Sequence, residues 1–192
     1  MHLSIIIPIY NEETLIPSLL RQLYSLSDNV KIILVNDGST DNTEKCLSTI
    51  PSSYTNIKVI TLKKNYGKGF AIRQAIKNIS TKFVCLVDGD LEISKKSLKK
   101  AIEILPHNYK NTVTVGIRWL KGNETKNLSG LGNYVVNQLF NLIFHENYND
   151  ILCCLKIIDT ELIKSLKLTS NGFGIETEIM AKLSLNGVKV DE

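Results

Sequence analysis

Several features that would fix the class of this protein are missing from its sequence. No apolar run approaches the roughly 18 residues that cross a bilayer, so we expect no transmembrane helix within these 192 residues. The apolar stretch HLSIIIPIY near the N-terminus is too short for a signal peptide and contains a proline. Histidine occurs three times without a cluster, so nothing indicates a zinc site.

The four cysteines, at positions 46, 85, 153 and 154, show no Cys-x-x-Cys spacing. We expect reduced thiols in a protein of the cytoplasm or of the cytoplasmic face of a membrane. Neither GxxxxGK[ST] nor GxGxxG occurs, which argues against a P-loop or a dinucleotide fingerprint. The net charge of +4 is dispersed, and no basic stripe is interleaved with aromatic residues, so nucleic-acid binding is not expected.

The composition and the pattern of apolar runs predict one α/β domain. Hydrophobic residues make up 43% and charged residues 22% of the chain, as in ordinary globular proteins. Apolar, β-branched runs alternate with helical patterns, and they predict strands at 3–10, 30–37, 57–64 and 82–90. This repeat predicts a mostly parallel sheet with helices on both faces. Asn11 is the expected N-cap of the first helix, although Pro17 could delay its start to about residue 15.

Each of these four strands is followed by a polar cluster. Right-handed crossovers place the carboxyl ends of parallel strands at one edge of the sheet, which is where ligands bind in open α/β folds. We therefore expect a ligand site where the clusters meet: Tyr10-Asn11-Glu12, Asn36-Asp37-Gly38, Asn65 to Gly69, and Asp88 to Glu92.

Asp88, Gly89 and Asp90 form the most informative cluster. Alternate residues of an extended segment point the same way, so the two carboxylates and that of Glu92 would lie close together. Such oxygens suit Mg²⁺ or Mn²⁺, which complete their coordination with phosphate oxygens and water. A solvated acidic turn is the alternative interpretation.

Two further clusters suggest contacts to a nucleotide. Asp37 could accept hydrogen bonds from a ribose or a base, or could simply form a turn. Lys68, in the glycine-containing segment NYGKG, offers a cation for phosphate, and a plain strand–helix turn is the alternative.

The second half of the chain is less regular. We expect a strand at 112–120, an almost wholly apolar helix at 129–144, a strand at 151–159 and a last helix from residue 175. The apolar helix is interpreted either as core packing or as a membrane-surface helix that receives a lipid. The final segment reads as a strand just starting, so we expect the natural protein to continue beyond it.

Four segments in this order, IIIPIYNEE, ILVNDGSTDNT, NYGKGFAIRQAI and FVCLVDGDLE, resemble the family-2 glycosyltransferases with a GT-A fold. These are inverting enzymes that use nucleotide-sugar donors. Glu92, together with GIRWLKG, NDILCCLKIID and GFGIETEIMAKLSLNGVKV, resembles more narrowly the polyprenyl-phosphate (dolichyl-phosphate) mannosyl- and glucosyltransferases.

The resemblance implies a role for each matching residue. It implies a nucleotide-sugar-binding half at 1–92 and an acceptor half at 93–192. Asp88 and Asp90 would hold the metal and the diphosphate, with Glu92 as a third ligand. Arg118 would face phosphate, and Glu176 and Glu178 would lie near the acceptor as candidate general bases. The donor pocket would be lined by Pro8, Tyr10, Asn11, Glu12, Asp37 and Lys68.

The implied reaction is transfer of a hexose from a UDP- or GDP-sugar to a polyprenyl or dolichyl phosphate, with peripheral membrane contact. Two departures affect this expectation: Asn36-Asp37 replaces an acid pair, and Cys153-Cys154-Leu155-Lys156 replaces Cys-Gly-Phe-Lys. Transfer to a saccharide hydroxyl remains open, as does a non-catalytic nucleotide-sugar-binding relative. A nucleotidyltransferase is disfavoured because PIYNEE is acidic and lacks a glycine-rich basic loop.

Overall fold

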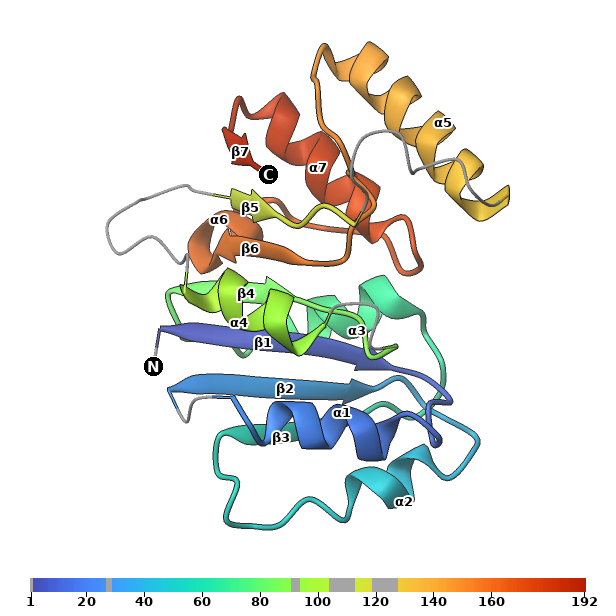
Figure 1. Ribbon diagram of the computed structural model, residues 1–192, viewed down its shortest axis with the longest axis vertical. Helices are drawn as coiled ribbons and strands as arrows, with labels where there is room; N and C mark the ends of the chain where they lie inside the picture. Colours follow the sequence, from blue (N-terminus) through green and yellow to red (C-terminus); the bar gives the residue numbers. More distant parts are fainter. Residues whose placement is uncertain (1, 27–28, 91–93, 104–112, 119–127) are drawn as a thin grey trace.

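The computed structural model describes residues 2–26, 29–90, 94–103, 113–118 and 128–192 (Figure 1). One seven-stranded sheet, in the order β3-β2-β1-β4-β6-β5-β7, runs through them. The elements are β1 (Leu3–Ile9), α1 (Ile16–Leu23), β2 (Val30–Asn36), α2 (Thr43–Leu47), β3 (Ile57–Thr61), α3 (Lys68–Ile76), β4 (Phe83–Leu86), α4 (Lys95–Glu103), β5 (Val113–Val115), α5 (Leu128–Phe144), β6 (Lys156–Asp159), α6 (Thr160–Ser165), α7 (Ile175–Leu185) and β7 (Val190–Asp191).

The first four strands are parallel, and three of them, β1, β2 and β4, are mostly buried, whereas β3 at the edge of the sheet is partly exposed. β1 lies between β2 and β4, and its side chains from Leu3 to Ile7 are almost fully buried. Figure 1 shows α1 and α4 in front of the sheet and α3 behind it, so both faces are covered. This cover explains why the strands are continuous apolar runs and not alternating ones. The predicted mostly parallel α/β sheet is confirmed.

The remaining strands extend the same sheet with mixed directions. β6 runs antiparallel to β4 and to β5, while β7 pairs with β5 in parallel. At this end of the molecule, α5 lies against α7 and away from the strands (Figure 1).

Several element boundaries differ from the expectations. Asn11 is not a helix cap, since α1 begins at Ile16, next to Pro17, and Asn11 adopts a φ of 54° in the preceding turn. The third strand ends at Thr61 and not at residue 64, and the fourth ends at Leu86 and not at residue 90, so Asp88 and Asp90 lie in the turn after it. The expected strand at 151–159 begins only at Lys156, because residues before it form a buried turn. Residues 113–118 of the expected strand at 112–120 are described, and of these only Val113–Val115 form a strand.

Candidate active site

A cavity of about 450 Å³ lies at the carboxyl edge of the parallel strands. The arrowheads of β1 and β2 point to this edge in Figure 1. Residues from four strand ends and from the loop before α7 line the cavity: Pro8, Ile9, Tyr10, Glu12, Asp37, Asn65, Gly67, Lys68, Asp88, Gly89, Asp90, Gly172 and Phe173. The structure therefore brings together most of the donor-pocket residues that the sequence predicts. Glu92 lies outside the described residues.

Asn11 is placed beside the cavity without lining it. Its side-chain oxygen accepts a hydrogen bond from the backbone N–H of Thr40 at 2.8 Å, and its own backbone N–H donates to Ser39 Oγ. Asn11 thus joins the turn after β1 to the turn after β2. In this position it shapes the neighbourhood of Tyr10 and Glu12.

Asp37 organises the loop between β3 and α3. Its carboxylate is buried and accepts hydrogen bonds from the backbone N–H groups of Tyr66 at 2.9 Å and Gly67 at 2.8 Å. Gly67 has a φ of 97°, a conformation that a glycine adopts without strain. Asp37 and Gly67 together set the start of α3, and hence the position of Lys68, its first residue.

Lys68 joins the two acidic sides of the site. Its Nζ lies 2.7 Å from Asp88 Oδ1 and 2.8 Å from Asp88 Oδ2, and it also contacts Glu176 in the first turn of α7. Burial opposes the charge, but Glu176 and then Asp88 raise the pKa of Lys68 above its usual range. Lys68 therefore stays an ammonium ion that neutralises part of this acidic cluster.

The acids at the cavity also influence one another. Burial, followed by the negative charges of Asp90 and Asp41, raises the pKa of Glu12. An excess of negative potential of this kind favours a bound cation. Among the described residues, no three His, Cys, Asp or Glu side chains form a preassembled metal cage. The carboxylate oxygens of Asp88 and Asp90 still fit Mg²⁺ or Mn²⁺, provided that ligand oxygens complete the coordination.

Arg118 lies in a second charged group, with Asp150. Its Nε and Nη2 donate to the Asp150 carboxylate at 2.8 and 3.0 Å, and its backbone N–H donates to the same group at 3.2 Å. Asp150 is buried, so this bidentate pair fixes the end of β5 against the turn before β6. Asp150 is not among the site residues that the sequence predicts. The only sign of its role in the sequence is that this acid directly precedes the apolar run ILCCL.

Lys156 is a second residue that the sequence analysis did not single out. It is fully buried, and its Nζ donates to the backbone oxygens of Ile151, at 3.0 Å, and Cys153. Burial lowers the pKa of Lys156, while the charges of Glu176 and Asp150 counteract this effect. A lone lysine within the apolar run ILCCLKIID was the clue to a buried polar contact.

Glu178 is placed away from the cavity lining. Its carboxylate accepts hydrogen bonds from the backbone N–H groups of Thr169 and Ser170, each at 2.8 Å, and pairs with Lys182 at 2.9 Å. Burial would raise the pKa of Glu178, but these contacts outweigh it and lower the pKa to about 2. A group with this pKa is a weak proton acceptor near neutral pH.

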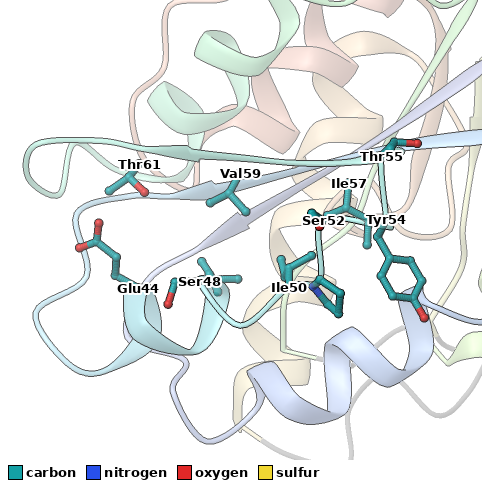
Figure 2. Close-up of a pocket in the computed structure, with 11 residues that line it drawn as sticks. Glu44, Ser48, Ile50, Ser52, Tyr54, Thr55, Ile57, Val59 and Thr61 are labelled. Atoms are coloured by element: carbon teal, nitrogen blue, oxygen red, sulfur yellow. The ribbon is translucent and has the colours of Figure 1, made fainter.

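A second hollow, of about 480 Å³, lies between α2, β3 and the loop that joins them (Figure 2). Its lining combines apolar and hydroxyl side chains with a single carboxylate, Glu44. None of the site residues predicted from the sequence lines it. Of the two hollows, only the first is therefore lined by predicted site residues.

Comparison with known proteins points to sugar transfer. Residues 4–166 match the family model described as "Glycosyl transferase family 2". The chain is 26% identical to glycosyltransferase AglJ of Haloferax volcanii, over 96% of this chain and 59% of that protein. It is 31% identical to a dolichyl-phosphate beta-glucosyltransferase of Dictyostelium discoideum, over 60% of this chain and 38% of that protein. The chain thus spans well under two thirds of both relatives.

Solved structures support the same fold. TarS of S. aureus superposes with a TM-score of 0.66 at 26% identity, over 97% of this chain and 56% of that chain. The mannosyltransferase PcManGT of Pyrobaculum calidifontis, solved in complex with GDP-Man and Mn²⁺, superposes with a TM-score of 0.68 at 16% identity. That match covers 99% of this chain and 54% of that chain. The expected GT-A architecture is confirmed.

Proposed function

Because the chain belongs to glycosyl transferase family 2, we propose that it is the catalytic domain of an inverting hexosyltransferase. Its donor would be a UDP- or GDP-sugar, and its acceptor a polyprenyl or dolichyl phosphate at the cytoplasmic face of a membrane. Residues 1–92 would bind the donor, and residues 93–192 would receive the acceptor.

The observation that carries this proposal is the convergence of Tyr10, Asp37, Lys68, Asp88 and Asp90 on one cavity. Tyr10 exposes its ring, which suits stacking on a nucleobase. Lys68 supplies a fixed positive charge for the diphosphate, and Asp37 holds the loop that carries Lys68. These are the groups that a nucleotide diphosphate requires from a protein.

Asp88 and Asp90 would hold Mg²⁺ or Mn²⁺, which when bound neutralises negative charge on the leaving diphosphate. Glu92 remains a proposed third ligand. In the transfer itself, an acceptor oxygen bonds to the anomeric carbon on the face opposite the donor diphosphate. As that bond forms, the bond from the anomeric carbon to the diphosphate oxygen breaks, and its electron pair leaves with the nucleoside diphosphate.

The state of the two candidate bases favours an acceptor that needs no base. Glu176 contacts Lys68, and Glu178 is committed to the loop at Thr169 and Ser170. A hydroxyl acceptor must lose a proton during transfer, whereas a lipid phosphate is already anionic. Arg118 is proposed to assist near that phosphate, while it remains paired with Asp150.

The exposed face of α5 supports a lipid acceptor. The helix contains no charged residue, and it exposes a continuous apolar face: Leu131, Val135, Leu139, Leu142 and Ile143. An apolar patch of this kind suits the surface of a bilayer. Among the described residues, no helix is long and apolar enough to cross one.

The proposal is tested by thermal unfolding with UDP- and GDP-sugars, each with and without Mn²⁺ or Mg²⁺. A ligand that binds only the folded state raises the melting temperature. We expect a metal-dependent rise with one nucleotide, which Asp90→Asn removes. The same donor is then offered dolichyl phosphate, undecaprenyl phosphate and a saccharide. If the sugar is transferred to the saccharide and to neither lipid phosphate, the proposed lipid acceptor is wrong. If the nucleotide binds but no acceptor receives the sugar, a non-catalytic nucleotide-sugar-binding module is favoured.

A further inference from the structure

Lys68 occupies the inner side of the acidic cluster. One ammonium group lies within hydrogen-bond distance of both oxygens of Asp88 and also contacts Glu176. The Lys68 side chain is only 11% exposed, so water replaces few of these contacts. Its Nζ also lies 5.8 Å from the centre of the Phe173 ring, at the mouth of the cavity.

This arrangement conflicts with metal binding by Asp88. A carboxylate ligand must present a lone pair to the metal, and Lys68 lies at one lone-pair position of each Asp88 oxygen, which leaves a second lone pair on each. An ammonium group also repels a dication at short range, and this repulsion is strong where water is excluded. A metal ion alone therefore approaches Asp88 against the repulsion of Lys68, and it binds well only when Lys68 moves away.

A nucleotide diphosphate removes this conflict. Lysine has three N–H donors, so Lys68 is able to keep its contact with Glu176 while it turns from Asp88 to a phosphate oxygen. Glu176 is buried at the start of α7 and also lies in the electrostatic field of Lys156, so it forms a fixed anchor. The phosphate oxygens at the same time supply the ligands that the metal needs.

We propose that Lys68 is a positioning residue that blocks Asp88 until a nucleotide diphosphate arrives, so that the metal and the nucleotide bind together. This inference rests on the proposed function, since it concerns the same donor site. In this inference Glu176 is not a general base. It keeps its ion pair with Lys68 when Lys68 leaves Asp88.

The test is Mn²⁺ binding to the nucleotide-free protein, measured from the electron paramagnetic resonance signal of free Mn²⁺. Wild type should bind weakly, and added UDP or GDP should tighten binding. Lys68→Met should bind Mn²⁺ alone roughly tenfold or more tightly, because a unit charge beside the dication is gone. The nucleotide should then tighten Mn²⁺ binding less than in wild type, because the two affinities are linked.

Matched variants separate this mechanism from a general change of charge. Lys64→Met removes a nearby positive charge that lies over the Tyr66 ring, and it should bind Mn²⁺ like wild type. Lys68→Arg keeps the positive charge, so this variant should bind Mn²⁺ alone as weakly as wild type. Lys68→Met/Glu176→Gln should retain the gain, whereas Lys68→Met/Asp88→Asn should lose it. Lys68→Gln serves in the same way if circular dichroism shows that Lys68→Met is unfolded.

The outcomes distinguish the inference from the proposed function. If wild type binds Mn²⁺ with UDP or GDP, but Lys68→Met gains no affinity for Mn²⁺ alone, the inference is overturned and the proposed function stands. The inference would also be overturned if both Lys68→Met/Glu176→Gln and Lys68→Met/Asp88→Asn lost the tighter Mn²⁺ binding. The metal would then bind between the two acids that Lys68 had separated, and not at Asp88 alone. If wild type binds neither nucleotide with Mn²⁺, the proposed function itself fails.

Discussion

At the scale of single residues, Glu178 shows a carboxylate whose contacts serve the fold. Besides two backbone N–H groups and Lys182, its oxygen accepts a hydrogen bond from Thr169 Oγ1 at 2.9 Å. Through these contacts α7 holds the segment that leads into Gly172 and Phe173, at the mouth of the cavity. Glu178 thus supports the site from outside.

Glu178→Gln should therefore destabilise the protein by about 2 kcal/mol at pH 7, the usual value of hydrogen bonds to a charged group. The folded-state pKa of about 2 is below the reference value of 4.5, so ionised Glu178 stabilises the fold above pH 4.5. This contribution is lost as the pH falls from 4.5 towards 2. Urea unfolding of both proteins at pH 7 and pH 3 measures it.

The gap in stability between wild type and Glu178→Gln should narrow at pH 3. Glu161→Gln is the control, because Glu161 is exposed and its pairing with Lys164 is long, at 3.5 Å. An equal gap at both pH values would show that the Glu178 charge does not contribute.

The place of a residue in the fold can be predicted from the sequence where local pattern decides it, whereas its role stays a prediction. Asp37, Lys68, Asp88 and Asp90 follow strand ends, and parallel strands bring their ends together whatever the rest of the fold does. Asp150 and Lys156 were not identified, because their partners depend on packing between segments. The pairing of Arg118 with Asp150 spans 32 positions, and no spacing in the sequence indicates it.

At the scale of elements, the turn between β3 and α3 is packed against the loop before α7. A Cβ atom on Gly67 would lie 2.5 Å from the backbone oxygen of Asn171, and one on Gly69 would lie 2.3 Å from that of Ser170. The two glycines therefore allow the start of α3 and the loop before α7 to touch.

Gly67→Ala should destabilise the protein by about 1–3 kcal/mol, because it adds both a clash and a strained φ. It should also weaken nucleotide binding, since it moves Lys68. Calorimetric unfolding and nucleotide titration measure the two effects. Gly132→Ala, where a Cβ meets nothing within 4 Å in the middle of α5, should be neutral or stabilising. Comparable losses in both variants would contradict this account of the turn.

The apolar face of α5 leads to a prediction for membrane binding. Leu139→Glu/Leu142→Glu should lower binding to anionic lipid vesicles by about tenfold or more, because it places two charges in the exposed apolar face that would enter the bilayer. Cosedimentation measures this. Leu185→Glu makes the same change on an exposed leucine of α7, outside the α5 face, and should bind like wild type. Equal binding by all three proteins would remove α5 from the membrane contact.

The prediction of a strand at 151–159 was wrong over its first five residues, because an apolar run alone does not specify the backbone conformation. Residues 151–155 are as apolar as a strand, but they form a turn in which Lys156 donates to the carbonyl groups of Ile151 and Cys153. An apolar run fits both a strand and a buried turn. In the first helix, the start near Pro17 agrees with the structure, whereas the expected cap at Asn11 does not, because α1 begins only at Ile16.

At the scale of the whole molecule, the proposed donor and acceptor halves share one sheet. β4 from the first half pairs with β6 from the second over four residues, and Cys85 lies opposite Ile157 in that pairing. Cys85, Cys153 and Cys154 are all buried, and Cys85 and Cys153 are near enough to interact electrostatically. Separate unfolding of either half would expose this shared interior, so we expect the described sheet to unfold as one unit.

The buried thiols provide the measurement. Burial raises the pKa of Cys85, and a buried thiol reacts only when its surroundings open. In a urea series with pulsed iodoacetamide, Cys46 should be labelled in the native protein because it is partly exposed. Cys85, Cys153 and Cys154 should become labelled together, at the urea concentration where circular dichroism reports loss of structure. Labelling of Cys153 and Cys154 at lower urea than Cys85 would show instead that the acceptor half opens by itself, and that the two halves are separate folding units joined at the β4–β6 pairing.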